Sequence, residues 1–154
     1  MDLTLSSRGD YVVRAAIALA DAWYGGAYLK AQEISERMAI PRSYVPELLG
    51  RLATAGLAVS RAGPTGGHRL ARDPLEVSLL EVIEAAEGPL VSQRCPIRGG
   101  PCRWTEVCAL HPTWLAASEA VRSTLAGTSL AGLAAVDDDL RRSGRDRVDR
   151  SAGA

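Results

Sequence analysis

Apolar residues recur in the first half of the chain as short helical runs separated by turn residues. Residues 10–23 carry apolar side chains on most helical turns, and the pair Gly25-Gly26 ends the run. In residues 30–40, Ile34 and Met38 stand four positions apart and therefore share one helical face. The pattern predicts two helices before residue 41.

A third helical run, residues 43–56, contains a proline near its start. With Ser43 as the N-cap, Pro46 falls in the first turn, where its missing N–H would have had no helical partner. Gly56 stands at the expected C-terminal end. The positions expected to be buried are Val45, Leu48, Leu49 and Leu52. We expect a helix whose start is fixed by Pro46.

Two runs of alternating residues, 57–60 and 68–71, flank the turn-rich sequence AGPTGG. Such runs on either side of glycine and proline predict a β-hairpin with a glycine-rich tip. Further helical patterns occupy residues 78–88 and 112–126, and residues 129–136 predict one more short helix.

The order of these elements is that of a winged helix-turn-helix: a helix, a tight turn, a second helix and a hairpin. Composition agrees, because the apolar residues are mostly Ala, Leu and Val, with no Phe, which favours packed helices over a β-sandwich. Beyond Val136 the chain has five aspartates and five arginines and almost nothing to bury. We predict a mainly α fold that divides into a winged helix-turn-helix DNA-binding domain (1–88), a cysteine loop (89–111), a helical segment (112–136) and a disordered tail (137–154).

In a winged helix-turn-helix, the second helix enters the major groove and its first residues meet base edges. The residues expected there are Arg42, Ser43, Tyr44 and Glu47, with Arg51 one turn further along to reach a phosphate. Glycines in a wing let the backbone approach the sugar–phosphate wall, and a neighbouring arginine can enter a minor groove. The expected wing residues are Arg61, Thr65, Gly66, Gly67, His68 and Arg69. The alternative is a compact fold whose arginines are only solvated.

Charge adds a little to this interpretation. The net charge is zero, but residues 40–74 hold five arginines against Glu47 and Asp73. A local basic segment in a neutral protein is compatible with a phosphate-binding face.

Several protein classes are not indicated. No apolar run reaches the roughly 18 residues of a membrane span, and the first ten residues lack the basic-then-apolar order of a signal peptide. We therefore expect a soluble, cytoplasmic protein. We find no paired carboxylates with a histidine, no phosphate loop and no nucleophile motif, so we do not expect an enzyme.

All three cysteines of the chain, Cys95, Cys102 and Cys108, lie in one segment that His111 closes. An odd number of cysteines in a reducing compartment makes a poor disulfide framework. The alternative of inert, buried thiols fits less well, because such cysteines normally sit singly on apolar helix faces, whereas these have proline, glycine and arginine neighbours. We interpret the segment as a ligand-binding loop.

The spacing Cys-x6-Cys-x5-Cys-x2-His lacks the tight C-x2–4-C pair with which structural zinc sites usually begin. Wide and irregular spacing fits an iron–sulfur cluster better. A Cys3His zinc site in a nucleic-acid-binding protein is the main alternative, but it leaves the preceding helix-turn-helix and hairpin unexplained. A small electron carrier would have no use for the wing.

The segments LTLSSRGDYVVRAAIALA, EISERMAIPRSYVPELLGRL and GLAVSRAGPTGGHRLARDP, followed by the cysteine loop, resemble the bacterial IscR/NsrR family of winged-helix regulators over residues 2–136. The resemblance implies a homodimer that binds promoter DNA and carries one iron–sulfur cluster per subunit. It also implies that residues 112–126 form the dimerisation helix. Cluster state would then control which operators are bound, in response to redox state, nitric oxide or iron supply.

The same resemblance leaves two residues as the fourth cluster ligand. In IscR-like members a histidine three residues after the last cysteine completes a [2Fe–2S] site, and His111 matches it. In some NsrR-like members an aspartate in the first helix of the other subunit completes a [4Fe–4S] site, and Asp10 matches that position. We favour His111 and [2Fe–2S], because an imidazole so close to Cys108 needs no partner chain to reach the iron.

Overall fold

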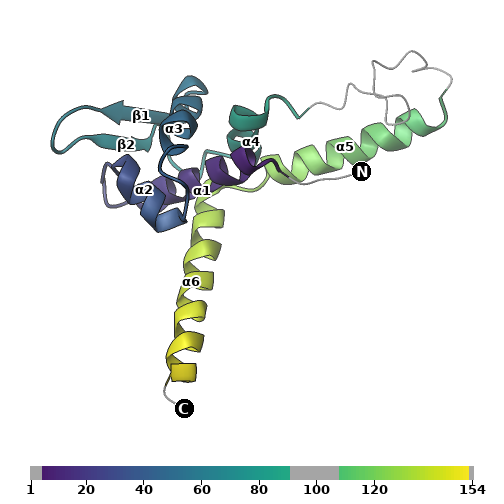
Figure 1. Cartoon of the computed structure of the whole chain (residues 1–154). Coiled ribbons are helices and arrows are strands. Elements are labelled where there is room, and N and C mark those ends of the chain that lie inside the picture. Colours follow the sequence, from purple (N-terminus) through teal and green to yellow (C-terminus); the bar gives the residue numbers. More distant parts are fainter. Residues whose placement is uncertain (1–4, 91–107, 153–154) are drawn as a thin grey trace.

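The computed structural model describes residues 5–90 and 108–152. Its elements in chain order are α1 (Ser7–Asp21), α2 (Ala31–Met38), α3 (Val45–Thr54), β1 (Ala58–Arg61), β2 (Gly67–Leu70), α4 (Leu79–Glu87), α5 (Leu110–Ala126) and α6 (Leu130–Ala152). Helices α1 to α4 and the two strands pack together, whereas α5 and α6 extend away from them in different directions (Figure 1). The mainly α fold expected from the pattern is confirmed.

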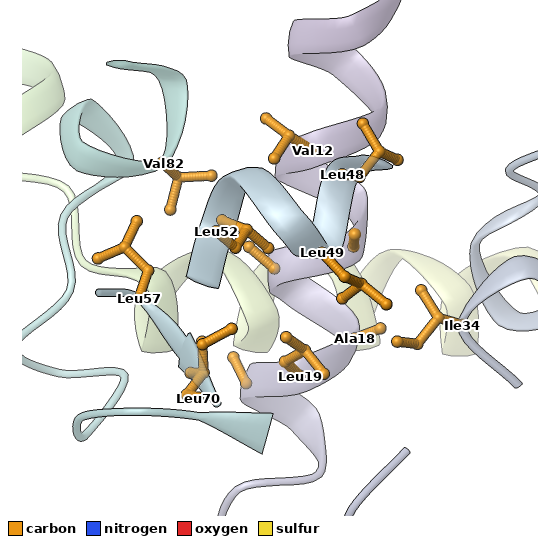
Figure 2. Close-up of a cluster of buried hydrophobic side chains, with 14 of the residues drawn as sticks. Val12, Ala18, Leu19, Ile34, Leu48, Leu49, Leu52, Leu57, Leu70 and Val82 are labelled. Carbon is orange, nitrogen blue, oxygen red and sulfur yellow. The ribbon is translucent and has the colours of Figure 1, made fainter. Parts of the chain in front are cut away.

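Helix α1 lies at the centre of the core. Val12 and Leu19 are fully buried, and the alanines between them let neighbouring helices approach α1 closely. Leu48 and Leu52 of α3 pack onto this helix, and Leu70 closes the core below the hairpin (Figure 2). Each fully buried leucine contributes about 2 kcal/mol of transfer free energy. This cluster therefore holds α3 firmly against α1.

The turn between α2 and α3 is tight. Ala39 caps α2 in the left-handed region, with φ 52°, and the Ile40 N–H donates to the Ser35 carbonyl oxygen. Helix α3 then begins at Val45 with Tyr44 as its N-cap, not Ser43 as expected. The Tyr44 N–H donates to the Pro41 carbonyl oxygen in the preceding turn, so the chain reaches helical geometry one residue later.

The hairpin forms where the alternating runs predict it, with each strand shifted by one residue toward the tip. Ala58 pairs with Leu70, and Arg61 pairs with Gly67 at the far end of the ladder. A bridge between Leu29 and His68 adds the segment before α2 to the open edge of β2. The wing is therefore braced from one side by the chain that leads into the helix-turn-helix.

Residues 137–152, expected to belong to a disordered tail, continue α6 as helix in the structure. Two ion pairs four residues apart, Asp137 with Arg141 and Asp138 with Arg142, support the helix along its surface. Leu130 and Ala134 anchor its start in the core. The charged composition of residues 137–152 provides no apolar helix face. The helix is instead stabilised by its buried first turns and by ion pairs along its own surface.

Candidate DNA-binding surface and cysteine segment

The residues just before α3 form an exposed turn. Arg42, Ser43 and Tyr44 all face solvent, and 46% of the Tyr44 surface is accessible. The Tyr44 ring meets the ring of Tyr11 from α1 edge to face, with centroids 5.6 Å apart. The partly exposed Tyr44 side chain therefore lies at the N-terminus of α3 and is held on one side by Tyr11.

Glu47 and Arg51, both expected to face DNA, are engaged with each other. The Glu47 Oε1 lies 3.0 Å from Arg51 Nη2 and 3.3 Å from Arg8 Nε. Arg51 also donates to the Ala86 carbonyl oxygen at the end of α4, over 3.4 Å. Both side chains remain partly exposed, and they join α3 to α1 and α4.

At the wing, Arg61 is held in a defined place. Its Nη2 donates to the Thr65 carbonyl oxygen at 2.8 Å, and its guanidinium lies 4.4 Å from the ring centroid of Tyr28. These contacts draw the arginine across the tip of the hairpin. Arg61 and Thr65 are both exposed there.

The two wing glycines have intramolecular reasons to be glycine. A Cβ on Gly66 would lie 2.1 Å from the Arg61 carbonyl oxygen, and one on Gly67 would lie 2.5 Å from the Leu29 carbonyl oxygen. Gly67 also has φ 148°, which L side chains rarely adopt. The glycines therefore permit the tight tip and the bridge that braces it.

Arg69 and His68 are half-buried on β2. The guanidinium of Arg69 stacks 4.3 Å from the Trp23 ring centroid, and its buried Nε has no hydrogen-bond partner among the residues that the structure describes. His68 Nδ1 lies 2.8 Å from Ser60 Oγ, and partial burial lowers the pKa of the imidazole, so its neutral form is favoured. These two side chains belong to the body of the wing, away from its tip.

Sequence reasoning missed the aromatic side chains that hold these arginines. Trp23, which stacks on Arg69, and Tyr28, which stacks on Arg61, both lie between α1 and α2. The available signal was the presence of large aromatic side chains in the polar, glycine-containing segment DAWYGGAYLK, in a chain with only seven Trp and Tyr in total.

The cysteine segment is described only at its end. Cys108 is a free, half-buried thiol directly before α5, and His111 lies in the first turn of that helix with its N–H bonded to the Cys108 carbonyl oxygen at 3.1 Å. Cys95 and Cys102 lie outside the described residues. The two donors described here, a thiol and an imidazole, are of the types that bind iron in iron–sulfur proteins.

Asp10, the other expected ligand, lies in the first turn of α1. Its carboxylate pairs with Arg14 one turn along the same helix, at 3.0 Å. The Asp10 carboxylate is therefore already engaged within its own chain.

The family model that matches residues 5–136 is Rrf2, described as an iron-dependent transcriptional regulator. The chain belongs to the Rrf2 family. The resemblance seen in the sequence motifs is thus confirmed, because IscR proteins are among the relatives of this Rrf2 chain.

Known proteins agree with this placement over most of their length. The IscR regulator of Klebsiella pneumoniae is 34% identical over 143 residues, which cover 93% of this chain and 86% of that protein. CymR of B. subtilis, described as the global cysteine regulator, superposes with a TM-score of 0.72 at 26% identity, covering 88% of this chain and 98% of CymR. IscR of T. potens gives a TM-score of 0.69 at 25% identity and 90% coverage of each chain.

This Rrf2 protein is therefore a helix-turn-helix transcriptional regulator, and its relatives are regulators, not enzymes. In the parts of the chain that the structure describes, no helix is both long and apolar enough to cross a membrane.

Proposed function

We propose that this Rrf2 regulator binds promoter DNA as a homodimer and that an iron–sulfur cluster controls this binding. The observation that carries the proposal is the gathering of every thiol of the chain into residues 95–108, directly before α5, in a member of an iron-dependent family. IscR relatives that match along nearly their whole length support it.

We assign the DNA contacts to the side chains that are free to make them. Arg42, Ser43 and Tyr44 are exposed at the head of α3, and Arg61 and Thr65 are exposed at the wing tip. Hydrogen-bond donors and a cation at these places match the base edges of a major groove and the phosphates or minor groove beside it. The remaining expected residues, which are Glu47, Arg51, Gly66, Gly67, His68 and Arg69, then act by holding α3 and the wing in shape.

We assign dimerisation to α5. None of the residues of this helix is buried within the single chain, although it presents large apolar side chains. Leu110, Leu115 and Val121 are 40%, 54% and 37% exposed. Apolar positions left open along one helix are the usual material of a helix–helix interface between subunits.

The cluster ligands in this proposal are Cys95, Cys102 and Cys108 with His111, and a [2Fe–2S] cluster is favoured. Bound there, the cluster supplies one-electron chemistry and a site that oxidants or nitric oxide attack. Cys108 and His111 hold their end of the ligand set at the start of α5, so a change in ligation acts directly on the dimerisation helix. The partner subunit's Asp10 is the alternative fourth ligand.

The test is a comparison of full-length variants purified without oxygen. We expect iron and sulfide in equal amounts and a [2Fe–2S] absorption and circular-dichroism spectrum, lost in Cys95→Ala, Cys102→Ala and Cys108→Ala. His111→Ala should alter the spectrum, whereas Asp10→Ala and the neighbouring control Thr113→Ala should not. Cluster removal should change the affinity for a promoter fragment that the unaltered chain selects from genomic DNA.

Three results would contradict the proposal. Colourless protein containing zinc would favour the Cys3His zinc-binding alternative. Metal-free protein that still binds its promoter would favour regulation closer to that of CymR, a cysteine regulator. A normal spectrum in His111→Ala with a lost one in Asp10→Ala would favour a cross-subunit [4Fe–4S] cluster.

A further inference from the structure

The charged C-terminal helix reaches back to the helix-turn-helix through one arginine. Arg141 of α6 donates from Nη1 to the carbonyl oxygen of Arg37 at 3.0 Å, and its Nη2 lies 2.8 Å from the Met38 sulfur. Its Nε is held by Asp137 Oδ2, one turn earlier on α6, at 2.6 Å. These contacts place this part of α6 against the C-terminal end of α2. The contact joins residues 104 positions apart in the sequence.

The carbonyl group that accepts from Arg141 lies at the C-terminal end of α2, directly before the tight turn. The last carbonyl groups of a helix have no partners within it and carry the negative end of its dipole, so a cation placed there is stabilising. From the other side, Arg14 Nη1 of α1 donates to the Met38 carbonyl oxygen at 3.4 Å. Two arginines from two different helices therefore cap one helix end.

That helix end is conformationally demanding. Ala39 follows it with φ 52°, and among the residues that the structure describes it is the only non-glycine residue with positive φ. Such a conformation costs free energy in an L residue and persists where the surroundings fix it. Six residues after Ala39 the chain enters α3, and the exposed turn in between carries Arg42 and Tyr44.

We propose that Arg141 is a positioning residue for operator binding, because it caps α2 from the C-terminal helix and thereby fixes the turn that presents Arg42 and Tyr44. The inference rests on operator contact through this turn. It does not depend on which cofactor the cysteine segment binds. It also gives the charged tail a role, because α6 holds α2, the first helix of the helix-turn-helix, in place.

The neighbouring residue provides a matched control. Arg142 carries the same charge on the same helix, but it pairs with Asp138 and Asp139 of α6 itself, and its side chain is 67% exposed. Replacing it removes one positive charge without touching α2. A comparison of the two positions separates the capping contact from the general attraction of an arginine for DNA.

The experiment compares full-length Arg141→Gln, Arg141→Lys and Arg142→Gln with the unaltered chain. Hydrogen exchange without DNA should become faster in Arg141→Gln at the amides of residues 39–44, while the buried amides of α1 keep their protection. Affinity for the selected promoter fragment should fall roughly 2- to 5-fold, the size expected for a cation at a helix C-terminus. Arg141→Lys, which keeps the charge beside α2, should recover most of that affinity, and Arg142→Gln should match the unaltered chain.

A second variant separates the capping contact from an effect on folding. Asp137→Asn keeps Arg141 in the chain but removes the carboxylate that holds its guanidinium. It should also weaken promoter binding, and the Asp137→Asn, Arg141→Gln double variant should show no further loss. Equal exchange rates at residues 39–44 together with equal promoter affinity in Arg141→Gln and Arg142→Gln would overturn the inference. Failure of the unaltered chain to bind promoter DNA at all would instead overturn the proposed function.

Discussion

The two arginines of the wing differ in exposure, because one packs against the protein and the other lies at the surface. Arg69 lies half-buried on Trp23, whereas Arg61 crosses the exposed tip. An arginine that contacts phosphate releases a counterion on binding, and a packed arginine does not. Under the proposed function, we therefore expect Arg61 and Arg69 to contribute differently to DNA binding, although they lie on paired strands.

We predict that Arg61→Ala lowers the salt slope of promoter binding by about one, because it removes one phosphate contact. Arg42→Ala should cost on the order of 1–3 kcal/mol on the specific site, as expected for loss of a base contact. Arg69→Ala is the control and should leave the salt slope unchanged while it lowers thermal stability. The measurement is fluorescence anisotropy over a series of salt concentrations. An Arg69→Ala variant with the lower slope, and an Arg61→Ala variant without it, would reverse the assignment.

The sequence predicts the surroundings of a residue well when its contacts are with neighbours in the chain, and poorly when they are with distant elements. The tight turn before α3 was predicted from the local pattern around Pro46, but the N-cap was placed at Ser43, one residue before the observed Tyr44. Gly66 and Gly67 were singled out for an approach to DNA, which stays a prediction. The structure adds a second reason for glycine, because a Cβ there would meet the carbonyl oxygens of Arg61 and Leu29. The stacking of Arg69 on Trp23 spans elements far apart in the chain, and no local pattern reveals it.

Helix α4 shows the opposite case, because the start of this helix is marked by a local capping motif in the sequence. Ser78 Oγ accepts from the Glu81 N–H at 3.2 Å, and Glu81 Oε2 accepts from the Ser78 N–H at 2.9 Å, which is a capping box. Arg72 adds an ion pair to the same carboxylate at 2.6 Å. Burial raises the pKa of Glu81, but the hydrogen bonds from Ser78 and Arg72 outweigh it, and the net pKa is lowered.

We predict that Glu81→Ala destabilises the chain by about 1 kcal/mol at neutral pH, as loss of a cap does. Since the folded-state pKa of Glu81 lies below its unfolded value, its charge stabilises the fold above the usual glutamate range, and this contribution is lost as pH falls through the lowered folded value. The difference between variant and unaltered chain should therefore shrink in acid. Urea denaturation at several pH values measures it, with exposed Glu76→Ala as control. A difference that grows in acid would contradict the assignment.

Helix α6 was predicted only in its first turns. Residues 129–136 have an apolar pattern, whereas the following aspartates and arginines give none, and composition alone indicated disorder. The helix is instead supported by charges four residues apart and by Arg141 on α2. Charge spacing carried the signal that hydrophobic periodicity lacked. The cysteine loop stays a prediction from spacing, since Cys95 and Cys102 lie outside the described residues.

At the scale of the whole molecule, α5 contacts the described chain at α4, where Arg122 Nη1 pairs with Glu84 Oε1 at 2.7 Å. Helix α5 leads away from the core and contributes no buried residue to it (Figure 1). Its exposed apolar side chains contrast with the core around α1, where Val12, Leu19 and Leu52 are fully buried.

We predict that Leu115→Glu converts the protein from dimer to monomer, because it places a charge where an apolar interface has to be desolvated. Thr113→Glu, exposed two residues earlier, is the charge control and should leave the dimer intact. Sedimentation equilibrium gives the mass directly. The Leu115→Glu variant should also lose promoter affinity by more than tenfold, since two half-sites are then bound independently. A Leu115→Glu protein that remains dimeric would move the interface elsewhere.

The central position of α1 has a consequence for synthesis of the protein. This helix is synthesised before Leu130 and Ala134, which complete its packing. Contacts between distant parts of a chain form late, because the loop between them must close first. A nascent or truncated chain that ends before Leu130 therefore exposes one side of α1 and lacks the clamp on α2. We expect a chain that ends there to hold the turn between α2 and α3 less firmly than the full-length chain.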